Sequence, residues 1–277
     1  MRILIQLTRI GLGGLMGLGC LVACLPAPRL TPPIVLPAAT PSPPALVAPT
    51  ATPPTSGWDE LFPGFEWREM RILMEDGFEE CLSVFRMAPA HNRFRVLYSP
   101  AQPEYVSAWD SAARLVFNAG FFDENNVALG LLVMDGQTFG QSYSGLGGMF
   151  QVTGDGTPRV RSLVAEPYQP GEALEQAVQG FPMLLRPDGT RYSDTGDARA
   201  RRTVIAQDAA GNILLIIAPH ETFTLAELAS WLASNPDLNL TVALNLDGGG
   251  STGYYAGPNN IAPSYVRLPA VVAVYER

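Results

Sequence analysis

The chain has 277 residues, with 26 acidic and 18 basic side chains and a formal net charge of −8 at pH 7. This acidic balance argues against binding a polyanion, so nucleic acid is not an expected partner. Three cysteines and two histidines without CxxC or HxxxH spacing argue against a zinc site built on these residues, whereas oxygen ligands leave calcium open.

The beginning of the chain has the composition of a targeting segment. Arg2 and Arg9 precede an uncharged stretch that is short and glycine-rich for a membrane span and fits a signal peptide. The stretch ends in Leu21-Val22-Ala23-Cys24, which resembles a bacterial lipobox. Residues 1–23 are therefore predicted to be a lipoprotein-type signal peptide and Cys24 the lipidated first mature residue. An ordinary secreted protein cleaved nearby is the alternative.

Residues 24–57 consist mainly of proline, alanine, threonine and aliphatic side chains. Eleven prolines between positions 25 and 57 favour an extended tether without a packed core. Residues 58–277 are long enough for one sizeable core and are predicted to form the folded domain. Together these features predict an extracytoplasmic protein anchored by lipid to a bacterial membrane, at the cell surface or in the periplasm.

Short apolar runs, broken by glycine, proline and Asp-Gly turns, predominate after residue 58. Such runs are typical of strands. In the first half of this region they predict strands at 71–74, 81–87, 93–98, 115–117, 129–134, 149–153 and 160–164, with a short helix at 105–113.

The second half adds the clearest local patterns. It predicts a helix at 171–178 and strands at 180–185, 203–207, 213–218, 241–246 and 270–275, with a further short strand at 254–255. A glycine turn joins 203–207 to 213–218 as a hairpin. Thr224 and Glu227 have capping-box spacing for a helix that Pro236 ends. This pattern predicts an α+β class: a strand-rich single domain with mixed or antiparallel sheets and a few helices.

One predicted strand, at 241–246, runs directly into Asp247, three glycines and Ser251. Glycines let a backbone adopt positive φ and approach a ligand, and their amides can converge on an anion. A carboxylate at such a strand end can act as acid, base or metal ligand. The pattern favours an active site at Asp247, and a tight glycine-rich hairpin turn is the alternative.

Four segments of the chain resemble, in the same order, those of the phosphodiester glycosidase family. They are Asn118-Ala119-Gly120-Phe121-Phe122, Gly180-Phe181-Pro182-Met183-Leu184, Arg202-Thr203-Val204-Ile205 and Asn245-Leu246-Asp247-Gly248-Gly249-Gly250-Ser251. The last segment is the most specific of the four. The resemblance implies a domain that removes a sugar, such as N-acetylglucosamine, from a phosphodiester. Bacterial relatives are often secreted or surface proteins.

Two segments depart from the family pattern. Ala218-Pro219-His220-Glu221 stands where an Asp-Gly-Arg usually follows the hairpin, and Ala262-Pro263-Ser264 replaces the usual Arg-Pro-Ser before the last strand. The leading interpretation is a surface-anchored hydrolase that cleaves a sugar-phosphodiester bond or a related cell-envelope glycan. The alternative is a non-catalytic surface module that binds a glycan or an envelope polymer in the same pocket.

The chemistry implied by this resemblance assigns roles to several residues. Cleavage at an anomeric carbon builds positive charge on the sugar and negative charge on the leaving phosphate. Asp247 is expected to stabilise the anomeric carbon or activate water, or else to bind calcium. Arg202 is expected to clamp the phosphate with its planar guanidinium, unless it is simply an exposed arginine. Glu221 is a candidate second carboxylate, with support of the following helix as its alternative.

The remaining candidates are expected to bind substrate. Asn118 would hold a sugar hydroxyl or orient Asp247, or else form an Asx turn. His220 would act as acid or base, or lie in solvent. The backbone amides and the hydroxyl expected to face the phosphate belong to Gly248, Gly249, Gly250 and Ser251. Calcium is the one cofactor left open.

Overall fold

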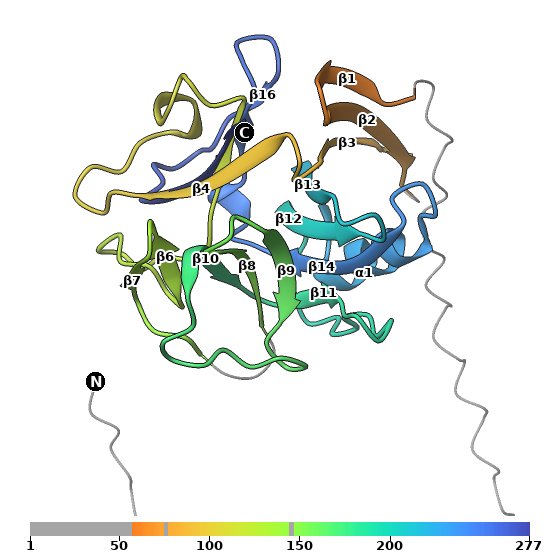
Figure 1. Ribbon diagram of the computed structural model, residues 1–277. Coiled ribbons are helices and arrows are strands. Elements are labelled where there is room, and N and C mark those ends of the chain that lie inside the picture. The colour runs from red at the N-terminus through yellow and green to blue at the C-terminus, as the bar shows by residue number, and fades with distance from the viewer. Residues whose placement is uncertain (1–56, 75–76, 144–146) are drawn as a thin grey trace, which may run out of the picture. The chain divides into compact units, whose positions relative to one another are not determined.

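The computed structural model describes residues 57–74, 77–143 and 147–277 (Figure 1). The predicted signal peptide, Cys24 and nearly all of the predicted tether lie outside these residues. Three sheets carry almost all regular structure in the described part, and every strand pair in them is antiparallel.

The first and largest sheet, called the large sheet below, contains the longest strands. Its central strand β13 reads Ile-Leu-Leu-Ile-Ile over its first five residues, a continuous apolar run typical of a strand covered on both faces. In spatial order its strands are β1 (Asp59–Phe62), β2 (Phe65–Leu73), β3 (Glu79–Met87), β13 (Ile213–Phe223), β12 (Ala200–Asp208), β14 (Leu240–Asn245) and β11 (Met183–Leu185).

Two smaller sheets complete the domain. The second sheet has the order β7 (Gln137–Phe139), β6 (Leu132–Met134), β10 (Leu174–Gly180), β8 (Gly148–Thr153) and β9 (Pro158–Ser162). The third has the order β16 (Ile261–Ala262), β15 (Tyr254–Tyr255), β5 (Leu115–Asn118), β17 (Ala270–Glu276) and β4 (Asn92–Tyr98).

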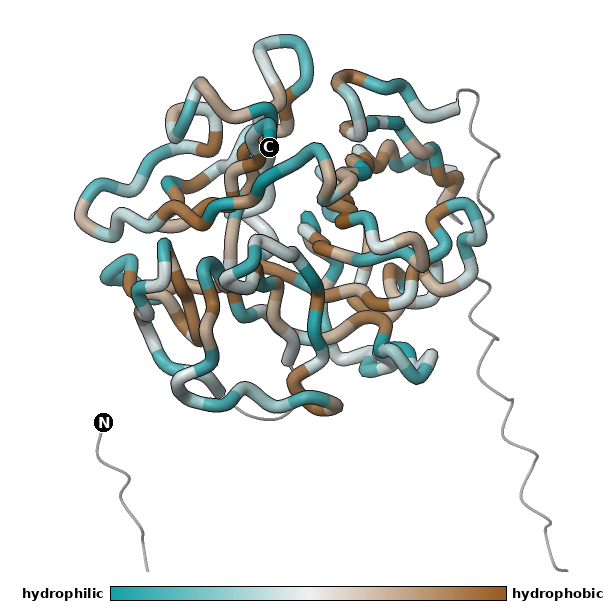
Figure 2. The backbone as a smooth tube through the Cα atoms, in the orientation of Figure 1, coloured by the Kyte–Doolittle hydropathy of each residue, from teal (hydrophilic) through white to brown (hydrophobic). Residues whose placement is uncertain are grey.

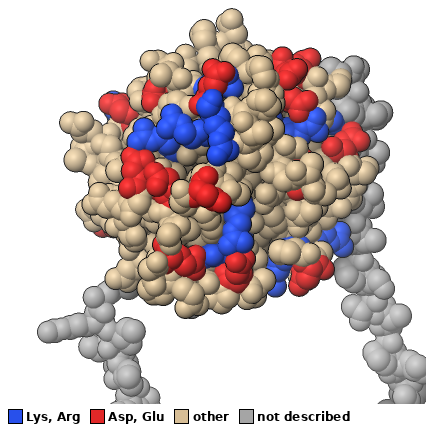
Figure 3. All heavy atoms as spheres, viewed as in Figure 1, with Lys and Arg blue, Asp and Glu red and all other residues tan. Residues whose placement is uncertain are grey.

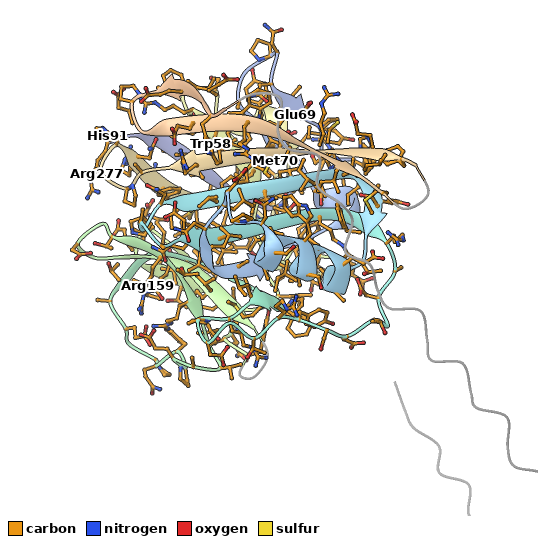
Figure 4. All side chains as sticks on the ribbon, turned by 90° about the vertical axis from the view of Figure 1, so that its right-hand side faces the viewer. Trp58, Glu69, Met70, His91, Arg159 and Arg277 are labelled. Atoms are coloured by element: carbon orange, nitrogen blue, oxygen red, sulfur yellow. The ribbon has the colours of Figure 1, made fainter. Side chains whose placement is uncertain are left out.

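One α-helix, α1 (Leu225–Ser234), covers one face of the large sheet (Figure 4). The predicted capping box is confirmed: Thr224 accepts a hydrogen bond from the Glu227 amide, and the Glu227 carboxylate accepts one from the Thr224 amide. Trp231, 1% exposed, packs with the sheet residues Leu82 and Val204. At the edge of the same sheet, the ring of Trp58 lies beneath the guanidinium of Arg86 (Figure 4).

The main core lies between the other face of the large sheet and the two smaller sheets. Phe85 from β3, Phe117 from β5 and Phe150 from β8 are fully buried in this one cluster. The hydropathy colouring shows brown, apolar strand centres joined by teal, polar connections (Figure 2). The strand ends at the margin of this core are therefore held on both sides, which gives a rigid support for side chains that follow them.

The predicted helix at 171–178 is wrong, because most of this stretch is strand β10. Glutamate, glutamine and alanine favour helices locally, but pairing with β6 and β8 overrides that preference. Both glutamines contribute to this outcome. Gln176 accepts a hydrogen bond from the Val96 amide, and Gln179 accepts one from the Leu131 amide, so their buried polar groups are satisfied only in the strand.

Two other predicted elements are shorter than expected. Of the helix at 105–113, only a 3₁₀ turn at Val106–Ala108 forms, since Asp110 accepts from the Ala112 amide and turns the chain. Of the strand at 180–185, only β11 forms, because Pro182 has no N–H for the ladder. The described residues thus contain one α-helix and are mostly β. The prediction of a strand-rich fold with antiparallel sheets is confirmed and that of a few helices is roughly right, whereas the α+β class is not confirmed.

No helix in the described ranges has the length and apolarity needed to cross a membrane. Acidic and basic side chains lie next to one another on the face shown in Figure 3. The ion pairs include Arg159–Glu166 at 2.8 Å and Arg161–Glu172 at 2.9 Å. Such pairs balance local charge and each contribute at most about 1 kcal/mol when exposed.

We expect Leu215→Ala to lower the free energy of unfolding by about 2–5 kcal/mol, because it leaves a cavity in the main core. The matched control is Leu61→Ala on β1, where the side chain is 40% exposed and the expected change is within about 0.5 kcal/mol. Urea unfolding of both variants measures the difference. Equal losses would contradict the proposed position of the core.

Candidate active site

Asn118 joins three of the segments singled out in the sequence. Its Nδ2 donates to the backbone carbonyl of Asp247 at 2.7 Å, and its Oδ1 accepts from Thr203 Oγ1 at 2.7 Å and from the Gly253 amide at 3.2 Å. The side chain is 1% exposed. Asn118 therefore orients Asp247, as one of its two expected roles states, and direct contact with a sugar is not supported by this geometry.

The segment around Gly180 reaches the same place through Asn245. Asn245 Nδ2 donates to the Phe181 carbonyl at 2.8 Å, and its amide donates to the Pro182 carbonyl at 3.0 Å. A Cβ on Gly180 would lie 2.5 Å from the Asn245 carbonyl oxygen, so only glycine allows this approach. All four segments consequently meet around the end of β14, where Asp247 follows.

Asp247 is partly exposed, and burial raises the pKa of its carboxyl above the ordinary value. Hydrogen bonds from the Ser251 hydroxyl and from the Gly248 amide, the latter at 2.9 Å, act in the opposite direction and stabilise the ionised form. The Ser251 hydroxyl and the Gly248 amide thus serve the carboxylate. The expected contacts of these two groups with phosphate stay a prediction.

The next two glycines are different. Gly249 has φ of +59°, and a Cβ placed there would meet nothing within 4 Å, so open space lies beside the turn. Among the described residues, the amides of Gly249 and Gly250 donate to no acceptor. These two N–H groups remain available to a ligand beside Asp247.

Arg202 lies on the helix side of the large sheet, not beside Asp247. Its Nη2 contacts Asp197 Oδ2 at 2.6 Å and the Ala198 carbonyl at 2.5 Å, and its Nε donates to the Phe223 carbonyl at 3.2 Å. Asp197 also accepts from the Leu225 amide at the start of α1. This arrangement does not support the expected phosphate clamp at Arg202. It indicates a structural ion pair that fastens β12 to the helix.

The preceding residue, Arg201, occupies the place that the clamp was expected to fill. It is 3% exposed, and its donors reach the carbonyls of Pro219 at 2.9 Å, Pro263 at 2.8 Å and Gly249 at 3.5 Å. Its guanidinium carbon lies 3.8 Å from the ring centroid of Tyr265. Within the described residues no carboxylate lies at ion-pair distance from Arg201.

The electrostatics of Arg201 are those of a largely unpaired internal cation. Burial lowers its pKa from the ordinary value, while Tyr265 and Glu221 raise it. Glu221 is exposed and lies close enough for its charge to act on Arg201. The structure therefore brings Asp247, the open glycine turn, Arg201 and Glu221 into one region.

His220 points elsewhere. Its Nδ1 lies 3.0 Å from Oε1 of Glu80, and its ring makes an edge contact with Phe78 at 5.6 Å between centroids. Glu80 is fully buried, and its other oxygen accepts from Thr222. His220 thus covers a buried carboxylate on β3. This geometry does not support its expected role as an acid or base beside Asp247.

A metal would need several ligands near Asp247. Across residues 57–74, 77–143 and 147–277, no group of three or more histidine, cysteine, aspartate and glutamate side chains gathers at one place. The acidic donor set beside the glycine turn consists of Asp247, with Glu221 on the Arg201 side. Calcium takes six to eight oxygen ligands, so these two side chains alone would supply only part of its coordination, and calcium stays a prediction.

A sequence comparison identifies the family, and comparisons with solved structures show the same fold. A model of the phosphodiester glycosidase family matches residues 111–274, which include all four segments. The fold is similar to the catalytic domain of zebrafish N-acetylglucosamine-1-phosphodiester α-N-acetylglucosaminidase, auto-inhibited by its pro-peptide, at 21% identity and a TM-score of 0.62, covering 79% of this chain and 86% of that chain. It is also similar to a hypothetical protein from Synechocystis, at 18% identity and a TM-score of 0.54, covering 83% and 64%. A search of curated proteins found no match.

We expect Asp247→Asn to raise the free energy of unfolding at pH 7. Burial raises the folded pKa of Asp247 above the unfolded value, so its ionised form destabilises the fold at neutral pH. That penalty fades as pH falls through the raised pKa and is absent below the ordinary value of 3.8. Urea unfolding at neutral pH and near the ordinary pKa should show the gain shrinking on acidification.

The control for this measurement is Asp188→Asn. Asp188 is exposed, and hydrogen bonds from Thr190 lower its pKa, so its loss should reduce stability at pH 7, the opposite sign. A gain at Asp247 that does not change with pH would contradict the burial argument.

Proposed function

The chain belongs to the phosphodiester glycosidase family, and on this premise we propose that it hydrolyses the bond between a sugar and a phosphodiester. The observation that carries the proposal is that a partly exposed carboxylate, Asp247, two free amides and the buried cation Arg201 lie in one region. Such a site has one group for each charge that develops during cleavage.

Asp247 stabilises the positive charge that develops on the sugar. As the anomeric carbon–oxygen bond breaks, the sugar becomes oxocarbenium-like, and a nearby carboxylate stabilises it. The Gly248 amide and the Ser251 hydroxyl hold Asp247 in its ionised form despite burial. Asn118 fixes the backbone from which this carboxylate projects.

Arg201 and the glycine turn stabilise the negative charge that develops on the leaving phosphate. A guanidinium has five N–H donors, and three contacts to backbone carbonyls leave two for a phosphate oxygen. The free amides of Gly249 and Gly250 add two further donors. A phosphate ester is already a good leaving group, so charge stabilisation by these donors replaces much of the need for a strong general acid.

Glu221 is proposed as the second carboxylate, which removes a proton from the attacking water. It is exposed, and its charge acts on Arg201. In a chain without the family's usual Asp-Gly-Arg after the hairpin, Glu221 is the acidic side chain that the altered segment at the end of β13 supplies.

The proposal extends to the location of the reaction. Lipidation at Cys24 and a tether over 24–57 would place the domain outside the cytoplasm on a bacterial membrane, with a cell-envelope glycan or sugar phosphodiester as substrate. The two altered segments support a second candidate, a surface module that binds such a glycan without cleaving it. Turnover separates the two.

We expect the full chain to cleave a methyl phosphodiester of an α-linked sugar 1-phosphate, and Asp247→Asn to lower kcat by about 10³-fold or more, because a neutral amide cannot stabilise the cationic carbon. The panel contains the N-acetylglucosamine, glucose, galactose and mannose compounds, each assayed with calcium and with EDTA.

Asp155→Asn is the control, since Asp155 is exposed in a turn between β8 and β9 and should leave kcat unchanged. Binding of a sugar by the wild-type chain without any turnover would favour the non-catalytic module.

Two neighbouring arginines provide a matched pair. Arg201→Lys should lower kcat/KM by about 100-fold, because an ammonium cannot replace the planar fork at the phosphate. Arg202→Lys should leave kcat/KM within about threefold and lower the free energy of unfolding by about 1–3 kcal/mol through its weakened pairing with Asp197. Steady-state kinetics and urea unfolding of both variants test this. The reverse pattern would restore Arg202 as the clamp.

A further inference from the structure

Tyr265 combines high exposure with firm attachment. Its side chain is 66% exposed, the most of any exposed large hydrophobic side chain in the described part of the chain. Its amide nevertheless donates to the Gly250 carbonyl at 2.7 Å, and its ring lies against the guanidinium of Arg201 at 3.8 Å. An aromatic side chain held in this way exposes its other face to solvent in a fixed orientation.

The support beneath the ring is rigid. Arg201 is buried and bound by the carbonyls of Pro219 and Pro263, so the guanidinium cannot follow a moving ring. The loop before Tyr265 is fixed as well, because the buried Ser264 hydroxyl accepts from the Val106 amide at 3.1 Å. The conformational entropy of this ring is therefore lost when the protein folds, so ligand binding does not have to order it.

Tyr265 lies beside the glycine turn that follows Asp247. A Cβ built on Gly250 would come within 3.9 Å of Tyr265 Cβ, and Gly250 belongs to the turn that begins at Asp247. The same turn carries the free amides of Gly249 and Gly250. A ligand that contacts these amides would therefore lie near Tyr265, whose Cβ and amide adjoin Gly250.

We propose that Tyr265 is a sugar-binding platform, which stacks its free face on the apolar C–H face of the pyranose ring of the substrate. This inference rests on the proposed function and deepens it, since it assigns a residue to recognition of the sugar. An aromatic face gives a large apolar contact area at a fixed position, while the few polar groups of a binding site fix the orientation of the ligand. Arg201 thus has two tasks, binding the phosphate and holding the platform.

The test compares Tyr265→Ala and Tyr265→Phe in the full chain with the same four methyl phosphodiesters. Tyr265→Ala should raise KM about 10-fold with kcat within about twofold, because stacking contributes to binding in both the ground and transition states. Tyr265→Phe keeps the ring and should keep KM. Phe62→Ala is the control. Phe62 lies on β1, an edge strand of the large sheet, where its side chain is 43% exposed and its ring lies beneath the guanidinium of Arg114.

A second readout does not depend on turnover. Saturation-transfer NMR with the methyl α-pyranosides of the four sugars should show contacts from the ring C–H protons in the wild-type chain and in Tyr265→Phe, and lose them in Tyr265→Ala. If these contacts depend on Tyr265 while no phosphodiester is cleaved, the platform stands and the proposed hydrolysis fails.

Two outcomes would overturn the platform. Turnover with an unchanged KM in Tyr265→Ala would leave the hydrolase without a sugar contact at this residue. Absence of both turnover and sugar contacts in the wild-type chain would remove the site from carbohydrate binding altogether.

Discussion

The hydrogen bonds of Asn118 are the constraint on which the site depends. One buried amide side chain joins the end of β5, the middle of β12 and the turn after β14, three segments far apart in the sequence. These segments come from two different sheets, so Asn118 also fixes how the large and third sheets meet at this margin. The position of Asp247 is thereby set by backbone contacts and not by the flexibility of its own side chain.

Burial of charge distinguishes this margin from the rest of the domain. Most other arginines in the described part of the chain pair with carboxylates, as Arg202 does with Asp197. Among the described residues, Arg201 contacts carbonyl dipoles and an aromatic face without a carboxylate at ion-pair distance, and Asp247 accepts from a hydroxyl and an amide. Each of these two groups lowers the stability of the fold when it is ionised, because burial disfavours its charge. A ligand group of opposite charge would offset that loss. The site is therefore arranged for a ligand or transition state that carries both charges.

Much of the fold was predictable because its signals are local. The capping box at Thr224, the glycine hairpin between β12 and β13 and the strand before Asp247 each depend on neighbours in sequence. The strand β10 was missed since Gln176 and Gln179 acquire partners only after folding. Arg201 and Arg202 could not be told apart, because a register shift between Ala200 and Arg202 decides which side chain faces the site. Tyr265 carried no signal in sequence, since its place depends on that same guanidinium.

The two parts of the site come from different kinds of structure. Asp247 is fixed by strand ends inside the four shared segments, whereas Glu221 lies in the altered segment at the end of β13 and Tyr265 directly follows the altered segment 262–264. Strands within a packed core tolerate little change, while loops can vary without loss of the fold. Arg201 connects the two parts, because it contacts Pro219 in one altered segment, Pro263 in the other and Gly249 in the turn. Variation in these two altered segments can thus change which sugar is bound without moving Asp247, the carboxylate that acts on it.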